Sequence, residues 1–136
     1  MHFLKTWTVT TILFFIGDIV WLYCVMNRFF VPHIKHLMNS SNNGIVINYL
    51  SALLAYMLIS SALSIFVVVT HMQDSLSSIF VHGAFLGLCL YGVYELTNYA
   101  ILHNWPLSFL IVDIVWGTLW CGIVSLASVA LIRYFK

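Results

Sequence analysis

Charge is what this sequence has least of. Only 7% of its 136 residues are charged, four acidic and five basic, whereas a soluble domain typically carries about 25%. The net charge of +1 provides no basic surface, so nucleic acid is excluded as a partner. Because 62% of the residues are hydrophobic and the mean hydropathy is +1.03, the composition is that of an integral membrane protein with the lipid bilayer as its first partner.

Cysteine is scarce, and its positions do not suggest a disulfide framework. The three cysteines, Cys24, Cys89 and Cys121, all fall inside apolar stretches, so we expect free thiols packed as small apolar groups. The zinc-protease, serine-hydrolase, phosphate-loop and Cys–His nucleophile patterns are also missing. We therefore expect no cofactor and no metal, and these absences favour a non-enzymatic role.

Long apolar runs are abundant by contrast. Four of them reach the roughly 20 residues that a membrane-crossing helix needs, near residues 6–29, 45–70, 76–102 and 105–134. They predict an all-α fold, an integral membrane bundle of four transmembrane helices in one domain covering residues 1–136. We do not interpret the first run as a cleaved signal peptide, because it is too long and lacks a small-residue cleavage site.

The connections predict where the helices end. Pro32 and the polar run 39–44 close the first connection, and the mixed basic and apolar stretch 27–38 is expected to lie at the membrane interface as a short amphipathic helix. Four spans place both termini on one side, together with Lys5, Arg133 and Lys136. The basic-residue bias of cytoplasmic segments then predicts cytoplasmic termini.

Three of the four acidic residues lie inside the predicted spans. These are Asp18, Glu95 and Asp113, and no basic residue lies mid-span with them. Each costs about 2.5–3.5 kcal/mol at a helix centre. At a rise of about 1.5 Å per residue, Glu95 and Asp113 lie roughly 10 and 12 Å from the turn that joins their helices, and Asp18 roughly 16 Å from the end of the first span. We expect the three to converge at a similar depth.

Each acid has aromatic or amide neighbours on the same helix face, three or four residues away. The string Asp-Ile-Val-Trp occurs at 18–21 and again at 113–116. Because those helices run in opposite directions, the repeat hints at an inverted duplication such as many transporters contain. The candidate residues for binding a substrate or a proton are Asp18, Trp21, Tyr91, Glu95, Asn98, Asp113 and Trp116.

Acids without an internal base allow three interpretations. In the first, Glu95 exchanges a proton for a cation, Asp113 and Asp18 assist it, Asn98 orients it, and the rings of Trp21, Tyr91 and Trp116 form a cage. In the second, the protein is an accessory or structural subunit whose protonated acids are hydrogen-bond donors between helices. In the third, paired carboxylates act as acid and base in a membrane-embedded lipid-modifying enzyme.

Small residues predict close helix packing. They lie on the second helix at Ser60, Ser61 and Ser64, and on the third at Gly83, Gly87 and Gly92. We expect the second and third helices to approach tightly, or one of them to make a dimer contact. A four-helix chain is too small to enclose a permeation path, so a homodimer or a partner membrane protein is expected beside a small cationic or polar ligand. The small multidrug transporters are an analogy on fold-level grounds only.

Several motifs together resemble a known family. They are Asp18-x-x-Trp21-Leu22, Gly83-Ala84-Phe85-Leu86-Gly87, Tyr91-x-x-Tyr94-Glu95-Leu96-Thr97-Asn98, Trp105-Pro106 and Asp113-x-x-Trp116-Gly117. Over essentially the whole chain this resembles the small four-helix bacterial membrane proteins grouped as domain of unknown function 2177. The resemblance implies the fold and a multi-pass location in the bacterial inner membrane, but no activity. Where the family usually carries Asp, this chain has Glu95, which reaches one methylene further.

Overall fold

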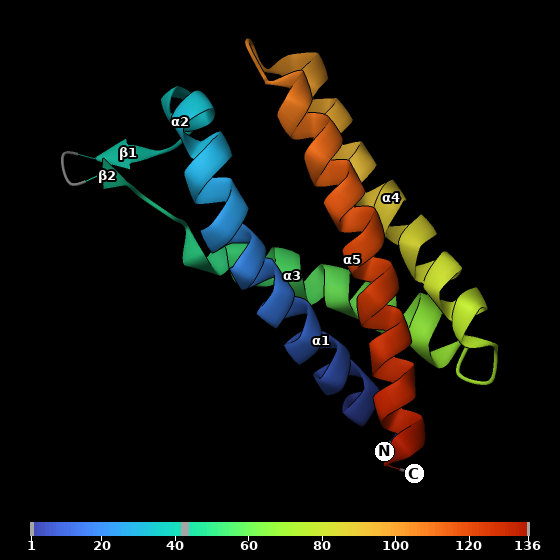
Figure 1. Ribbon diagram of the computed structural model, residues 1–136. Helices are drawn as coiled ribbons and strands as arrows, with labels where there is room; N and C mark the ends of the chain where they lie inside the picture. Colours follow the sequence, from blue (N-terminus) through green and yellow to red (C-terminus); the bar gives the residue numbers. More distant parts are fainter. Residues whose placement is uncertain (1, 42–43, 136) are drawn as a thin grey trace.

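The computed structural model describes residues 2–41 and 44–135 and confirms the predicted all-α fold (Figure 1). Four helical segments of the described residues are long and apolar enough to cross a membrane. In chain order the elements are α1 (His2–Trp21), η1 (Leu22–Phe30), α2 (Val31–Ile34), η2 (Lys35–Leu37), β1 (Ser40–Ser41), β2 (Gly44–Ile45), α3 (Tyr49–Leu63), η3 (Ser64–Val69), α4 (Leu76–Ile101) and α5 (Leu107–Tyr134).

The first helical segment is longer than we predicted. It runs over Phe3–Leu37, 35 residues, rather than ending near residue 29. Pro32 does not stop it: the prolyl ring lies at the second position of α2, directly after η1, and removes one backbone hydrogen bond without ending the helical run. The nine residues of η1 before it form a π-helix. The stretch 27–38 is thus a continuation of the first span rather than a separate amphipathic helix.

Helices α4 and α5 form a closely packed antiparallel hairpin (Figure 1). A Cβ atom added to Gly87 would overlap the backbone oxygen of Gly117 and the Cβ of Cys121, and one added to Gly83 would meet Ser125. The close approach that these glycines permit is therefore between the third and fourth helices. Our prediction that they bring the second and third helices together is wrong, because the sequence pattern marks a small face without identifying what packs against it.

Three apolar clusters hold the segments together. At the end of the bundle where the termini lie, Val67 and Val68 of η3 pack with Ile79 and Val129. Phe14, Leu63, Cys121 and Val124 form the central cluster. At the opposite end Ile34 packs with Trp105, Phe109 and Leu110 and joins the first segment to the start of α5. Helix α3 runs obliquely across the others (Figure 1), which leaves a space between it and the α4–α5 hairpin.

The two chain ends described by the structure lie side by side (Figure 1), and Lys5 Nζ donates a hydrogen bond to the Phe135 backbone oxygen at 3.5 Å. An even number of spans places both ends on the same side of the membrane, and here they are also neighbours. The cysteines are free thiols, as predicted; Cys121 is buried, while Cys24 and Cys89 face outwards.

Candidate functional site

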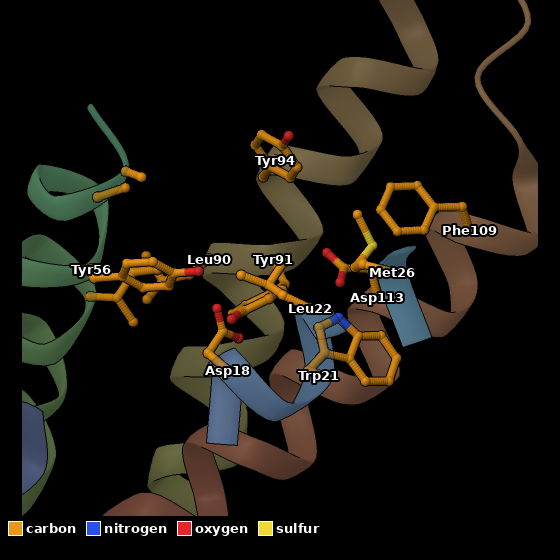
Figure 2. A pocket seen from close by; sticks show the side chains of 13 residues that line it. Asp18, Trp21, Leu22, Met26, Tyr56, Leu90, Tyr91, Tyr94, Phe109 and Asp113 are labelled. Carbon is orange, nitrogen blue, oxygen red and sulfur yellow. The ribbon is translucent and has the colours of Figure 1, made fainter. Parts of the chain in front are cut away.

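A cavity of about 400 Å³ lies between the first segment, α3 and the α4–α5 hairpin (Figure 2). Its position follows from the oblique path of α3, which spreads away from α4 at this level. The side chains that line it are mainly aromatic and apolar, with two carboxyl groups among them. The lining includes Asp18, Trp21, Leu22, Met26, Tyr56, Tyr91, Tyr94, Phe109 and Asp113.

The two carboxyl groups in the lining come from different helices. Asp18 on α1 is 6% exposed and Asp113 on α5 is 8% exposed. The Trp116 indole donates a hydrogen bond to Asp18 at 3.4 Å from Nε1 to Oδ1. The Tyr56 and Tyr91 side chains lie near Asp18, and Figure 2 shows the Tyr56 ring reaching towards it from α3. Asp18 is thus surrounded by neutral donors and has no basic partner among the described residues.

The two Asp-Ile-Val-Trp motifs contact each other reciprocally. Trp116 of the second motif donates a hydrogen bond to Asp18 of the first, and Figure 2 shows the Trp21 indole of the first lying beside Asp113 of the second. The two indole rings stack with their centroids 4.5 Å apart and their planes 6° from parallel. The repeated string is therefore one structural unit built from α1 and α5, which run in opposite directions.

Glu95 lies behind this unit and is fully buried, with 0% exposure. The Trp105 indole donates a hydrogen bond to Glu95 Oε2 at 2.8 Å from Nε1. Oε1 accepts no hydrogen bond from any donor in the described residues, and the Asp113 carboxyl is a nearby polar group. Two carboxyl groups form a hydrogen bond only when one of them carries a proton, so such a bond between Glu95 and Asp113 requires a shared proton.

Four of the seven predicted site residues, Asp18, Trp21, Tyr91 and Asp113, line the same cavity. Glu95 joins them through Asp113, on which both other acids act electrostatically. Two of the three acids, Asp18 and Asp113, thus line one cavity, while Glu95 does not line it.

The other two predicted residues have different roles from those we expected. Trp116 lies between Trp21 and Trp120, whose ring centroids are 4.5 and 5.3 Å away. Trp116 is stacked against these two rings and does not line the cavity. It therefore packs behind Trp21 and does not face a ligand. Asn98 is a hydrogen-bond partner of Tyr94, and the residue that orients Glu95 is Trp105.

Sequence reasoning missed Tyr56 and Trp105. Tyr56 comes from the second helix, which contains no acid, so no spacing pointed to it. Trp105 follows Asn104, whose φ of 61° is the left-handed conformation that Asn tolerates better than most residues. That turn directs Trp105 back onto the end of α4. The sequence Asn-Trp-Pro after the third span was the signal that could have revealed it.

Four apolar helices around an internal acidic and aromatic cavity define a multi-pass membrane protein with a buried polar site. Residues 3–130 match the family described as predicted membrane protein (DUF2177). The chain belongs to this family, in agreement with the resemblance of its motifs. Comparisons with curated proteins and with solved structures give no match.

The Trp105–Glu95 hydrogen bond leads to a stability prediction. Trp105→Phe removes the one donor that the structure gives to the fully buried Glu95 carboxyl, so we expect a loss of about 1–3 kcal/mol in unfolding free energy. Unfolding in detergent, followed by circular dichroism, measures it. Trp7→Phe is the matched control, because the Ser61 hydroxyl that Trp7 contacts can rotate to another partner. Equal losses in the two variants would contradict the assignment.

Proposed function

We propose that this protein binds a small organic cation in the cavity and exchanges it for a proton, as a small transporter or binding protein. The observation that supports this most is the pairing of Asp18 and Asp113 in one aromatic lining. In the described residues the one ion pair is His71–Asp74, outside the cavity. Buried carboxyl groups without a base are costly in a membrane protein and are retained mainly for function.

The chemistry of the lining matches a cation better than an anion or a neutral molecule. Carboxylates attract a positive charge, and the faces of Tyr, Trp and Phe rings attract it further. Tyr56, Tyr91 and Phe109 supply such rings, and Trp21 has one face free of Trp116. A cavity of about 400 Å³ lies in the range that holds drug-sized ligands. An aromatic amine or quaternary ammonium of one or two rings fits this description.

The proton in this proposal resides on the Glu95–Asp113 pair. A cation that enters beside Asp113 stabilises the charged form of that carboxyl and competes with the proton that the pair shares. Glu95 has no exposed surface, so it acts through Asp113 and does not touch the ligand itself. Binding and proton release are then coupled because both use Asp113.

Orientation and assembly complete the proposal. Lys5 and Arg133 lie at the end of the bundle with the termini, and Lys136 follows Arg133 in the sequence, whereas Arg28 and Lys35 belong to the far end of the first segment. Three basic residues against two assign the termini to the cytoplasm of a bacterial inner membrane. A single chain encloses a cavity but little of a path across the bilayer. Transport, unlike binding, therefore requires a second copy or a partner membrane protein.

The test uses inside-out vesicles with an imposed proton gradient and a panel of amines and quaternary ammonium ions. We expect at least one compound to dissipate the gradient in vesicles with the wild-type protein, and this response to vanish in Glu95→Gln. No response to any compound, with the protein folded and inserted, would argue instead for an accessory subunit whose acids only join helices.

A further inference from the structure

A second polar cluster lies outside the cavity, at the end of the bundle where the termini meet. His71 and Asp74 belong to the turn between η3 and α4, and His82 lies almost two turns into α4. The His71 and His82 rings stack with centroids 3.9 Å apart and planes 17° from parallel. One nitrogen of each ring and one Asp74 oxygen all lie within 4.8 Å of one another. The cavity and its acids do not involve these residues.

The hydrogen bonds define which nitrogens are free. His82 Nδ1 lies 2.8 Å from the Ser78 backbone oxygen, and since a carbonyl oxygen only accepts, Nδ1 carries the proton. His71 Nδ1 lies 2.7 Å from Asp74 Oδ2, so a metal ion held by both groups would replace the proton between them. His82 keeps its Nε2 lone pair. A histidine that ligates a metal almost always donates its other N–H to a carbonyl or carboxylate.

The turn that bears the cluster is held in place from a different helix. Arg133 of α5 donates three hydrogen bonds to the backbone oxygens of Met72 and Asp74, at 2.6 to 3.0 Å. At the start of α4, the Ser75 hydroxyl accepts a hydrogen bond from the Ser78 amide. The positions of His71 and Asp74 are thus set by contacts that need no ligand, which reduces the ordering cost of binding one.

We infer that His71, His82 and Asp74 form a binding site for a divalent transition-metal ion of the zinc type. Two imidazoles and a carboxylate are a ligand set that zinc accepts, with a fourth position left open, whereas calcium and magnesium prefer oxygen ligands alone. Zinc–nitrogen bonds of about 2.0–2.1 Å place ligand atoms roughly 3.3 Å apart. The ligand atoms lie up to roughly 1.5 Å further apart than in such a site, and the stacked rings must rotate so that their lone pairs converge on the ion.

Access and charge agree with this inference. The side chains of His71 and Asp74 are 23% and 43% exposed, so an ion can reach them from water. Asp74 supplies a carboxylate, which offsets part of the charge of the bound ion. In the orientation proposed above, the cluster faces the cytoplasm.

The experiment titrates Co²⁺ into the full chain, purified in detergent without a polyhistidine tag and treated with a chelator. We expect visible absorption of a four-coordinate ion at one Co²⁺ per chain, displaced by Zn²⁺. His82→Ala should weaken Zn²⁺ binding by at least about 100-fold, and His103→Ala, an exposed histidine at the other end, should not change it. Zn²⁺ should raise the melting temperature of the wild type but not of His82→Ala.

Three outcomes decide the inference. Stoichiometric binding that His71→Ala and His82→Ala both abolish supports it. Absence of binding, or equal affinity in the wild type and both variants, overturns it. His82 is an exposed residue of a long helix, so its replacement should leave the fold intact, and circular dichroism verifies this. The result is independent of cation binding in the cavity, because no cavity residue is changed.

Discussion

Asp113→Asn should abolish cation binding in the cavity while the bundle stays folded. Asparagine keeps the size of the side chain but removes the charge nearest the ligand and the partner of Glu95. Removing one member of a buried charge pair costs about 2–5 kcal/mol, which lowers affinity by at least about 30-fold. Equilibrium binding of benzyltrimethylammonium or another responsive cation to the purified protein measures it.

The matched control for this prediction is Asp74→Asn. It makes the same chemical change at the remaining acid of the chain, in the turn before α4, and should leave cation affinity unchanged. Asp18→Asn should weaken binding as well, because Asp18 lines the opposite part of the same cavity. If Asp113→Asn binds the cation as tightly as the wild type, Asp113 is not the charge that recognises it, and the proposed function fails at its central residue.

Gly87→Leu should prevent the α4–α5 hairpin from packing. Even a single Cβ at this position meets the backbone oxygen of Gly117 and the Cβ of Cys121, atoms that cannot move unless the two helices separate. Overpacking of this kind costs about 1–3 kcal/mol, which we expect for Gly87→Ala, and the leucine variant should exceed it. Reversible unfolding in detergent measures the loss in Gly87→Ala, and the yield of monodisperse protein measures the effect of Gly87→Leu.

Gly92 on the same helix provides the control for Gly87. A Cβ added there has no atom within 4 Å, so Gly92→Ala should be neutral or should stabilise the helix by about 0.5–1 kcal/mol, the usual advantage of Ala over Gly in a helix. A loss at Gly92 as large as that at Gly87 would mean that helix propensity or lipid contact, and not the approach of α5, dominates at both positions.

Local sequence was sufficient for the architecture and for most of the site. The apolar runs identified four spans because the bilayer accepts only helices of a minimum length and hydrophobicity. The three acids without a base marked the polar interior for the same reason. Spacing along each helix then placed Trp21 on the same face as Asp18 and Tyr91 on the same face as Glu95, because neighbours on a helix face lie three or four residues apart.

Contacts between helices were beyond the reach of sequence reasoning. The glycines of α4 marked a small face correctly, but α5 and not α3 packs on it. Trp116 shares a helix face with Asp113, as predicted. Its ring, however, stacks on Trp21 and Trp120, and its indole N–H donates a hydrogen bond to Asp18 on another helix. Asn98 had the right spacing to orient Glu95, but Trp105, beyond the helix end, holds that carboxyl. The helical run continued through Pro32, where the chain changes from π-helix to α-helix.

One physical cause explains why the sequence predicted the helices but not the contacts between them. Helix formation and its periodicity depend on residues within a few positions of each other, so the chain's own pattern determines the spans and the residues that share a face. Which faces meet depends on the rotation, tilt and crossing of whole helices, which many side-chain contacts decide together. In this protein the oblique path of α3 opened the cavity, and the antiparallel approach of α1 and α5 brought the two Asp-Ile-Val-Trp motifs into reciprocal contact.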